Sequence, residues 1–490
     1  MSFLNKSRII LQQNNRNPFS KAVDLFMEYR WEILLFLLLI IVLMFITPAN
    51  YQLLAGLILT AGIIFWLNLK PSWGLWLIGL TFPFINWQIY LSQNLNAPPV
   101  DWIGLILLFA TLVLTLRTNS YRQFKLPLLL YFLIFFMVAL ISVGQSYFWE
   151  IGLKYILRPY LFCYLVYLVL PANLIKSEQR LWQMIKLIYL VSLLVALLSL
   201  LYSIFFAPEQ NEIFRMVPFS LGNFQPLGSN QNLLAELMVL AVPLAACLGF
   251  ITYQRHKLFG RLIMVSIFFL VAVLLLTLSR AGWLVLGLQI IFFWLWIWPN
   301  LPNRDLWRKK FKQFFQNYLA LFLLFTLMAG FLMLQLFSSP VVSSSDSNRI
   351  LQWKIGLEML RSNYLFGTGP GSFMEVLNRD PYFQYEFGSN LDAHGLALKL
   401  LSEVGILGTL FFILFLFILL RRGVKILLKL KDRQNEYLIL SCLLLTCVSA
   451  LVFQLFNTSY LTAKMWLPLG IFTAAAYLYE RKIYEKKSSG

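Results

Sequence analysis

Three residues of this sequence, Arg280, Arg349 and His394, have side chains suited to chemistry on an anionic substrate. Guanidinium groups offer fixed pairs of hydrogen-bond donors to phosphate oxygens. An imidazole titrates near neutral pH and can take a proton from a hydroxyl group. His394 is one of only two histidines in the chain, and it shares the polar segment 348–408 with Arg349. Together these residues are candidates for a site that binds an anion and accepts a proton.

His394 and Arg280 also have a structural interpretation. A lone histidine before a helix is more often structural than catalytic, and Arg280, between two apolar runs, can extend to lipid headgroups. The other histidine, His256, lies between Arg255 and Lys257 and is predicted to be solvated. The functional interpretation gains weight because the predicted topology places all three candidates on one face, by an argument that does not use their chemistry.

Residues 349–361 are predicted to form a short amphipathic helix at the membrane interface, because apolar and charged residues recur there at helical spacing. The polar residues 343–348 before it are expected to be a flexible lead-in. The apolar face comprises Ile350, Trp353, Leu357 and Leu360, and the charged face comprises Lys354, Glu358 and Arg361.

A glycine-rich turn, FGTGPGSF, ends this helix at residues 366–373. Gly367, Gly369, Pro370 and Gly371 cannot continue a helix. The favoured interpretation is a tight loop between the helix and the next segment, and the alternative is close backbone approach to a ligand. The turn does not follow a strand, so it does not indicate a dinucleotide site.

The composition predicts an all-α, polytopic membrane protein. Of the 490 residues, 60% are hydrophobic and 12% are charged, and the mean hydropathy is +0.73. Apolar windows long enough to cross a bilayer predict about 12 to 14 spanning helices. These windows lie at 31–48, 51–68, 72–91, 102–116, 126–145, 155–171, 182–206, 232–252, 262–278, 281–298, 319–337, 402–420, 437–456 and 463–479.

The distribution of lysine and arginine predicts that both termini are cytoplasmic. With that orientation, all but ten of the 40 Lys and Arg residues are cytoplasmic, as the positive-inside rule expects. The N-terminal stretch has no signal-peptide cleavage pattern and is expected to be a retained tail. The basic clusters suit anionic lipid, and nucleic-acid binding is not expected. The ten exceptions are Lys154, Arg158, Arg215, Arg280, Arg349, Lys354, Arg361, Arg379, Lys399 and Lys464.

Two long external connections, 207–231 and 338–401, stand out among otherwise short loops. Long loops in compact proteins are usually functional or disordered, and the aromatic content here favours packing. The four cysteines lie in apolar runs and are expected to be core residues. We therefore divide the chain into a tail at 1–30, helices at 31–206, a core at 207–420 that contains both loops, and helices with a tail at 421–490.

Four stretches resemble the O-antigen ligase/polymerase superfamily: GSNQNLLAELM, SRAGWLVLG, NRILQWKIGLEMLRSNYLFGTGPGSF and AHGLALKLLSEVGILG. The resemblance covers about residues 215–415. It implies a GT-C-like helical glycosyltransferase of the bacterial inner membrane, in O-antigen or exopolysaccharide biosynthesis. Such an enzyme moves a glycan from an undecaprenyl-diphosphate carrier to an acceptor hydroxyl on the periplasmic side. The acceptor is a glycan, lipid A-core or a protein, and ligase and polymerase are not distinguished.

The resemblance also implies roles for residues. Arg280 and Arg349 would bind the donor diphosphate, and His394 would deprotonate or orient the acceptor hydroxyl. The sequence departs from the family pattern at Gly395, where asparagine often follows the histidine. Secondary candidates are Arg215, Lys354 and Arg361 for carrier or glycan contacts, and Glu403 for orienting His394 or merely starting a helix.

No metal or other cofactor is indicated by the sequence. A departing diphosphate needs positive charge, and two arginines can supply it where no external Asp-x-Asp pattern is present to hold a metal. Two other classes stay open. A transporter of small anions or bicarbonate would place its charges at the bilayer midplane, and a noncatalytic scaffold for polysaccharide assembly would tolerate the loss of His394.

Overall fold

A computed structural model of the chain describes residues 71–92, 95–206, 215–222, 224–300, 308–309, 330, 340–387, 392–457 and 462–488. The predicted spans 31–48 and 51–68 lie outside these residues. So does the predicted span 319–337, except for Gly330.

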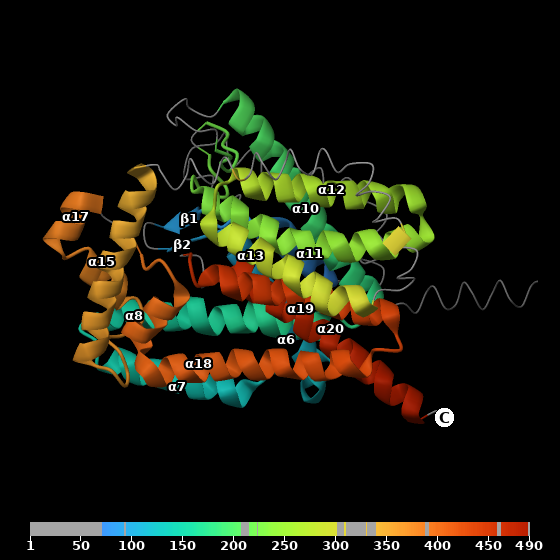
Figure 1. Ribbon diagram of the computed structural model, residues 1–490. Helices are drawn as coiled ribbons and strands as arrows, with labels where there is room; N and C mark the ends of the chain where they lie inside the picture. Colours follow the sequence, from blue (N-terminus) through green and yellow to red (C-terminus); the bar gives the residue numbers. More distant parts are fainter. Residues whose placement is uncertain are drawn as a thin grey trace, which may run out of the picture.

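The described chain is a bundle of helices with one short antiparallel hairpin, β1 (Ile89–Ser92) with β2 (Leu95–Ala97). Most long helices run side by side, and the C-terminus lies at the end opposite to α15 (Figure 1). The helices are α5 Pro71–Thr81, α6 Pro99–Arg117, α7 Leu129–Gly144, α8 Trp149–Tyr155, α9 Leu170–Leu174, α10 Glu178–Phe205, α11 Gln231–Arg255, α12 Lys257–Leu276, α13 Arg280–Phe292, α15 Pro340–Ser362, α16 Ser372–Leu377, α17 Pro381–Phe387, α18 Leu396–Lys429, α19 Gln434–Gln454 and α20 Ala463–Ser488.

Eight helices in the described ranges are long and apolar enough to cross a membrane. The expectation of an all-α, polytopic membrane protein is therefore confirmed. The predicted span 72–91 is wrong, because α5 ends at Thr81 and the hairpin follows it. Pro83 explains the end of α5, since proline lacks an N–H donor and disfavours helical geometry in the residue before it.

The predicted span 155–171 is part of a longer helical segment, Trp149–Leu174. It continues from α8 through two π-helical stretches, Ile156–Phe162 and Tyr164–Val169, into α9. Pro159 lies in the first of these stretches, where its missing N–H disturbs the regular α-helical bonding. The whole segment has 26 residues, which is long enough to cross a bilayer.

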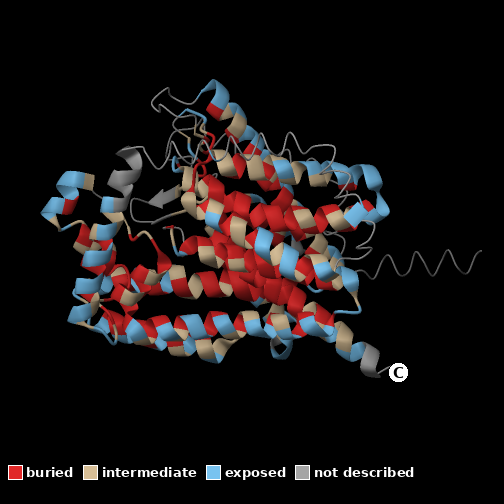
Figure 2. Cartoon of the chain, viewed as in Figure 1, coloured by how far each residue is buried: buried red, intermediate tan, exposed pale blue. Residues whose placement is uncertain are grey.

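Helices α11 and α19 form the centre of the bundle. In their most apolar windows 83% and 78% of residues are buried, against 22% in α12. Figure 2 shows this contrast as a continuous buried zone through α11 and α19, with exposed positions along α12. A helix that is apolar on all sides belongs in a core, whereas the exposed apolar residues of α12 suit contact with lipid.

A separate layer covers one end of the bundle, which we call the α15 end. Helix α15 runs across the ends of the long helices (Figure 1). This layer has its own small apolar core, which joins α15, α16 and α17 to the start of α18. Its buried residues are Ile355, Met359, Phe373, Leu377, Phe383, Ala393 and Leu398.

Helix α15 differs from the predicted helix 349–361 in its start and in its buried face. It begins at Pro340, so residues 343–348 are helical and not a flexible lead-in. Proline suits a first helical turn, where its missing N–H has no partner to lose. The face toward α18 is also different from the predicted apolar face, because Gly356 allows close contact with Leu398 there. As a result Ile350, Trp353 and Leu357 are exposed, while Gln352, Ile355 and Met359 are buried.

Candidate functional site

His394 lies at the α15 end, two residues before α18 begins. It is half-buried, and its backbone N–H donates to the side-chain oxygen Oε1 of Gln352, 2.8 Å away. Gln352 is fully buried in α15 and donates from Nε2 to Oδ1 of Asn348, also at 2.8 Å. The loop before α18 is thereby joined to α15.

Arg349 lies one helical turn before Gln352, so the two residues share a side of α15. Burial lowers the pKa of His394, the positive charge of Arg349 lowers it further, and the carboxylate of Asp392 opposes the effect. The structure therefore brings Arg349 and His394 together. It favours a neutral imidazole at neutral pH, which is the form that can accept a proton.

Asp392 is tied to α18 through a buried lysine. Nζ of Lys399 lies 2.7 Å from Oδ1 and 2.5 Å from Oδ2 of Asp392. The Lys399 side chain is only 2% exposed, and the hydroxyl of Tyr155 lies 3.3 Å from its nitrogen. The charge of Lys399 is directed to these internal partners. Its role is therefore to hold Asp392, and with it the segment before α18, against the bundle.

Glu403 contacts the backbone at the start of α16 and not the imidazole. Its Oε1 accepts the N–H of Phe373 at 3.1 Å and lies 3.4 Å from Nζ of Lys399. Among the described residues, Glu403 forms no hydrogen bond or ion pair with His394. No direct contact therefore supports the predicted role of Glu403 in orienting His394. The observed contact caps the start of α16.

The glycine-rich turn packs against a break in α18. At Gly405 (φ +67°) the helical conformation of α18 is interrupted. Backbone groups of residues 364–369 provide hydrogen-bond partners for the backbone groups on both sides of this break. The N–H groups of Ile406 and Leu407 donate to the carbonyls of Tyr364 and Leu365 at 2.9 and 3.2 Å. In return, the carbonyls of Ser402 and Glu403 accept from the N–H groups at 368 and 369, at 3.0 and 2.9 Å.

These bonds explain the glycines. A Cβ at Gly367 would collide with the backbone of Glu403, and one at Gly405 would collide with the carbonyl of Leu365. The favoured interpretation as a tight loop is confirmed, and the close backbone approach is to the chain itself. By these hydrogen bonds the turn holds the break in α18, and so sets the orientation of residues 396–404, which follow His394.

Arg280 is the first residue of α13, directly after a tight turn that contains Leu278 (φ +55°). Arg215 lies against this turn, with its Nε donating to the carbonyl of Thr277 at 3.1 Å. Burial lowers the pKa of Arg215. Arg215 therefore contacts the turn that ends at Arg280.

A series of contacts connects this turn to the His394 segment. The Cβ of Ala235 in α11 lies 3.3 Å from the place that a Cβ at Gly282 would occupy. The next residue, Glu236, accepts from Nε2 of Gln454 in α19 at 2.6 Å. The carbonyl of Leu455 then lies 2.6 Å from the position of a Cβ at Gly395. Helices α11 and α19 thus fix the distance between the two groups of candidate residues.

The sequence analysis missed a buried ion pair in this series. Glu236 and Lys464 are both fully buried, 3.3 Å apart. The lysine also donates to the carbonyl of Leu233 at 3.3 Å. A charged residue within an apolar window was the signal available, since such residues are costly unless they are paired or functional.

Lys354 and Arg361 lie on the exposed side of α15. Their neighbours include Trp353 and Leu357, which are 43% and 44% exposed. The structure places these two cations on the outward surface, on the other side of the helix from buried Gln352.

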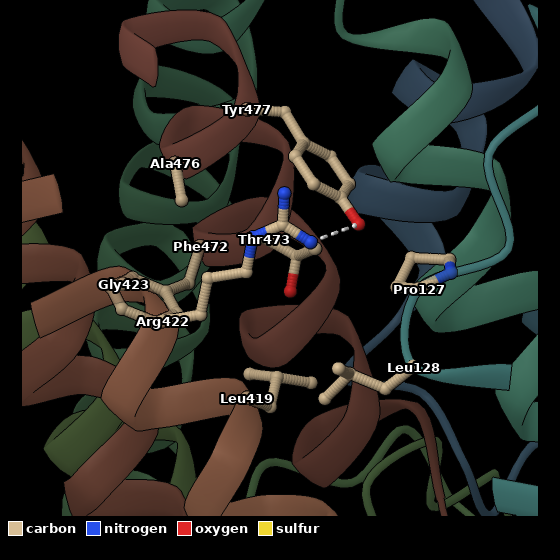
Figure 3. A pocket seen from close by; sticks show the side chains of 9 residues that line it. All are labelled: Pro127, Leu128, Leu419, Arg422, Gly423, Phe472, Thr473, Ala476 and Tyr477. Carbon is tan, nitrogen blue, oxygen red and sulfur yellow. Dashed lines mark hydrogen bonds between the residues drawn. The ribbon is translucent and has the colours of Figure 1, made fainter. Parts of the chain in front are cut away.

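A small pocket lies near the opposite end of α18, between the start of α7, α18 and α20. Figure 3 shows the guanidinium of Arg422 beside the ring of Tyr477, with a 3.4 Å bond to its hydroxyl. Arg422 also pairs with Glu480 at 3.0 Å. Twenty-six residues of helix separate Arg422 from the start of α18, or roughly 40 Å. This pocket is separate from the His394 site.

Residues 265–413 match the family described as O-Antigen ligase. This region runs from within α12 to the middle of α18, and it contains Arg280, Arg349 and His394. The region is therefore O-antigen ligase-like, as the motifs indicated. The match supports a membrane glycosyltransferase of the O-antigen ligase or polymerase type. No curated protein matches the sequence.

Proposed function

We propose that the protein transfers or polymerises a glycan from an undecaprenyl-diphosphate-linked donor onto an acceptor hydroxyl. The observation that carries this proposal is the half-buried His394, whose pKa is lowered by burial and by the nearby charge of Arg349. A neutral imidazole beside a cation suits a reaction in which a hydroxyl loses a proton while an anion departs.

In the proposed reaction the acceptor oxygen forms a bond to the anomeric carbon of the donor sugar. The bond between that carbon and the phosphate oxygen breaks, and undecaprenyl diphosphate leaves with the bonding electrons. His394 takes the hydroxyl proton. Arg349 and Arg280 bind the diphosphate, and Arg215, which contacts the turn before Arg280, is a further cation. This scheme uses side chains of the chain alone, so metal independence is part of the proposal.

The α15 end faces the periplasm in this proposal, and both termini are cytoplasmic in the inner membrane. The excess of Lys and Arg at the opposite end supports this orientation. The exposed side of α15, with Lys354 and Arg361 beside apolar residues, suits contact with headgroups, carrier lipid or glycan. The division into a 207–420 core with flanking helices belongs to the same proposal.

Transfer in proteoliposomes tests the function directly. The donor is undecaprenyl-diphosphate-linked glycan from the host, added with its native acceptor fractions. We expect the wild type to release undecaprenyl diphosphate and to extend or transfer the glycan, and we expect His394→Ala and Arg349→Ala to lose this activity. His256→Ala is the matched control, because this exposed histidine lies between α11 and α12, far from the site.

The product distinguishes a polymerase from a ligase. Absence of turnover by well-folded wild type, or turnover unaffected by either variant, would contradict the proposal. The result would then favour a transporter of small anions or a noncatalytic scaffold.

The orientation has its own test with impermeant thiol reagents. The four native cysteines are buried, so background labelling should be low. A cysteine at exposed Ser362 should react in cells whose outer membrane alone is permeabilised, and a cysteine at exposed Asp432 should react only after lysis. The reverse pattern would overturn the orientation.

A further inference from the structure

The backbone N–H of His394 needs a partner from outside its own helix. It lies just before α18, where the first N–H groups have no helical acceptor. Gly395, with φ +134°, turns the chain into the helix. The acceptor for His394 is Oε1 of Gln352, at 2.8 Å. One side-chain bond from α15 therefore satisfies the histidine backbone.

Gln352 is well suited to hold a fixed position. It is 0% exposed, and its amide group is used on both sides, toward His394 and toward Asn348. Buried polar groups are costly when they lose a partner, which disfavours other arrangements of this amide. Gln352 lies one turn from Arg349 on the same helix.

The same segment has other supports that do not involve α15. Asp392 is held by Lys399 of α18, and Gly395 lies against the carbonyl of Leu455 at the end of α19. These contacts fasten the segment to the bundle. The bond to Gln352 fastens it to the helix that carries Arg349.

We propose that Gln352 is a positioning residue, which holds the His394 ring in register with Arg349 through the histidine backbone. This inference rests on the proposed function, because it assigns to Gln352 the alignment of the base with the diphosphate-binding arginine. A misplacement of about 1 Å can reduce a rate by about 10²-fold. The bond at His394 is short and direct enough to control such a displacement.

Several charged or titratable groups act on His394 or support its segment. Arg349 comes from α15, Asp392 precedes the histidine, and Lys399 and Glu403 lie behind them on α18. Tyr155 of α8 completes the group through Lys399. A carboxylate placed at position 352 would add a negative charge within hydrogen-bond distance of the histidine backbone.

The test compares Gln352→Met, which keeps the size and removes the acceptor, with Gln352→Glu, which keeps an acceptor oxygen. We expect Gln352→Met to lower kcat by about 10²-fold while the KM for the lipid-linked donor stays the same, because Arg349 is retained. Gln384→Met is the control, since this exposed glutamine of α17 lies in the same layer.

We expect Gln352→Glu to retain most of kcat at high pH. The fall of kcat at acid pH should begin at a higher pH than in the wild type, because the added carboxylate raises the pKa of His394. A purely structural role would give equal losses in both variants with an unchanged pH profile, and that result would overturn the inference. Full activity of Gln352→Met would overturn it as well.

Failure of the proposed function gives a different result. If the wild type lacks transfer activity, or if His394→Ala retains it, the proposed function fails and the inference about Gln352 fails with it. If His394→Ala is inactive and Gln352→Met is fully active, only the inference fails. Thermal unfolding of each purified variant shows whether it is folded. If Gln352→Met is not folded, the pH profile of Gln352→Glu still tests the inference.

Discussion

Glu236 of α11 and Lys464 at the start of α20 form an ion pair with both side chains fully buried, 3.3 Å apart. The Glu236 carboxylate also accepts from Gln454 of α19. The pair therefore joins three helices of the bundle core. It lies close behind the segment of His394, because Leu455 follows Gln454 and contacts Gly395.

Breaking this pair should destabilise the protein strongly. Removal of one partner leaves an uncompensated buried charge, so Lys464→Met should lower the free energy of unfolding by about 3–5 kcal/mol. The double variant Lys464→Met with Glu236→Gln should recover much of that loss. Thermal unfolding in detergent measures both effects, and equal stability of the two variants would show that the charges are not coupled.

The break in α18 predicts an intolerance at Gly405. Gly405→Ala should destabilise by about 1–3 kcal/mol, because φ is positive there and a Cβ meets the carbonyl of Leu365. Activity should fall too, since the break directs the helix that follows His394. Gly287→Ala is the control, because no atom beyond its chain neighbours and its own helix backbone lies within 4 Å of its Cβ position. Equal unfolding temperatures for both variants would argue against the strain.

The pH profile should respond to Asp392. Activity requires neutral His394, so it falls as the pH drops through the pKa of this histidine. The Asp392 carboxylate raises that pKa against the effects of burial and Arg349. Asp392→Asn should therefore move the acid limb of kcat/KM to lower pH. Asp432→Asn, exposed between α18 and α19, is the control; equal limbs in both variants would exclude His394 as the titrating group.

The position of Arg280 at the start of α13 predicts that donor binding depends on its guanidinium group and not only on its charge. Arg280→Lys keeps the charge but loses the planar pair of donors. If one charge-assisted hydrogen bond to the diphosphate is lost, at about 1.5–3 kcal/mol, the kcat/KM for the donor should fall roughly 10- to 100-fold. Arg261→Lys on the exposed side of α12 should have no such effect. Unchanged donor kinetics in Arg280→Lys would remove this residue from the proposed site.

The sequence by itself determined the class of fold and the list of candidate residues. Apolar windows predict membrane helices because a bilayer leaves few alternatives for the backbone. Eight of these helices are present in the described residues. The rarity of histidine (His394), the polar segment with Arg349, the position of Arg280 between apolar runs and the family resemblance selected these three residues. The family match over residues 265–413 includes all three.

Only the tertiary structure decided how these residues are supported. The spacing of apolar residues predicted that Ile350, Trp353 and Leu357 face inward, but packing against α18 turns the side with Gln352 inward. Glu403 has no sequence signal that distinguishes a partner of His394 from a cap for α16. The roles of Gln352, Lys399 and Lys464 depend on partners far away in the chain. Such contacts arise from packing between helices, which local periodicity does not encode.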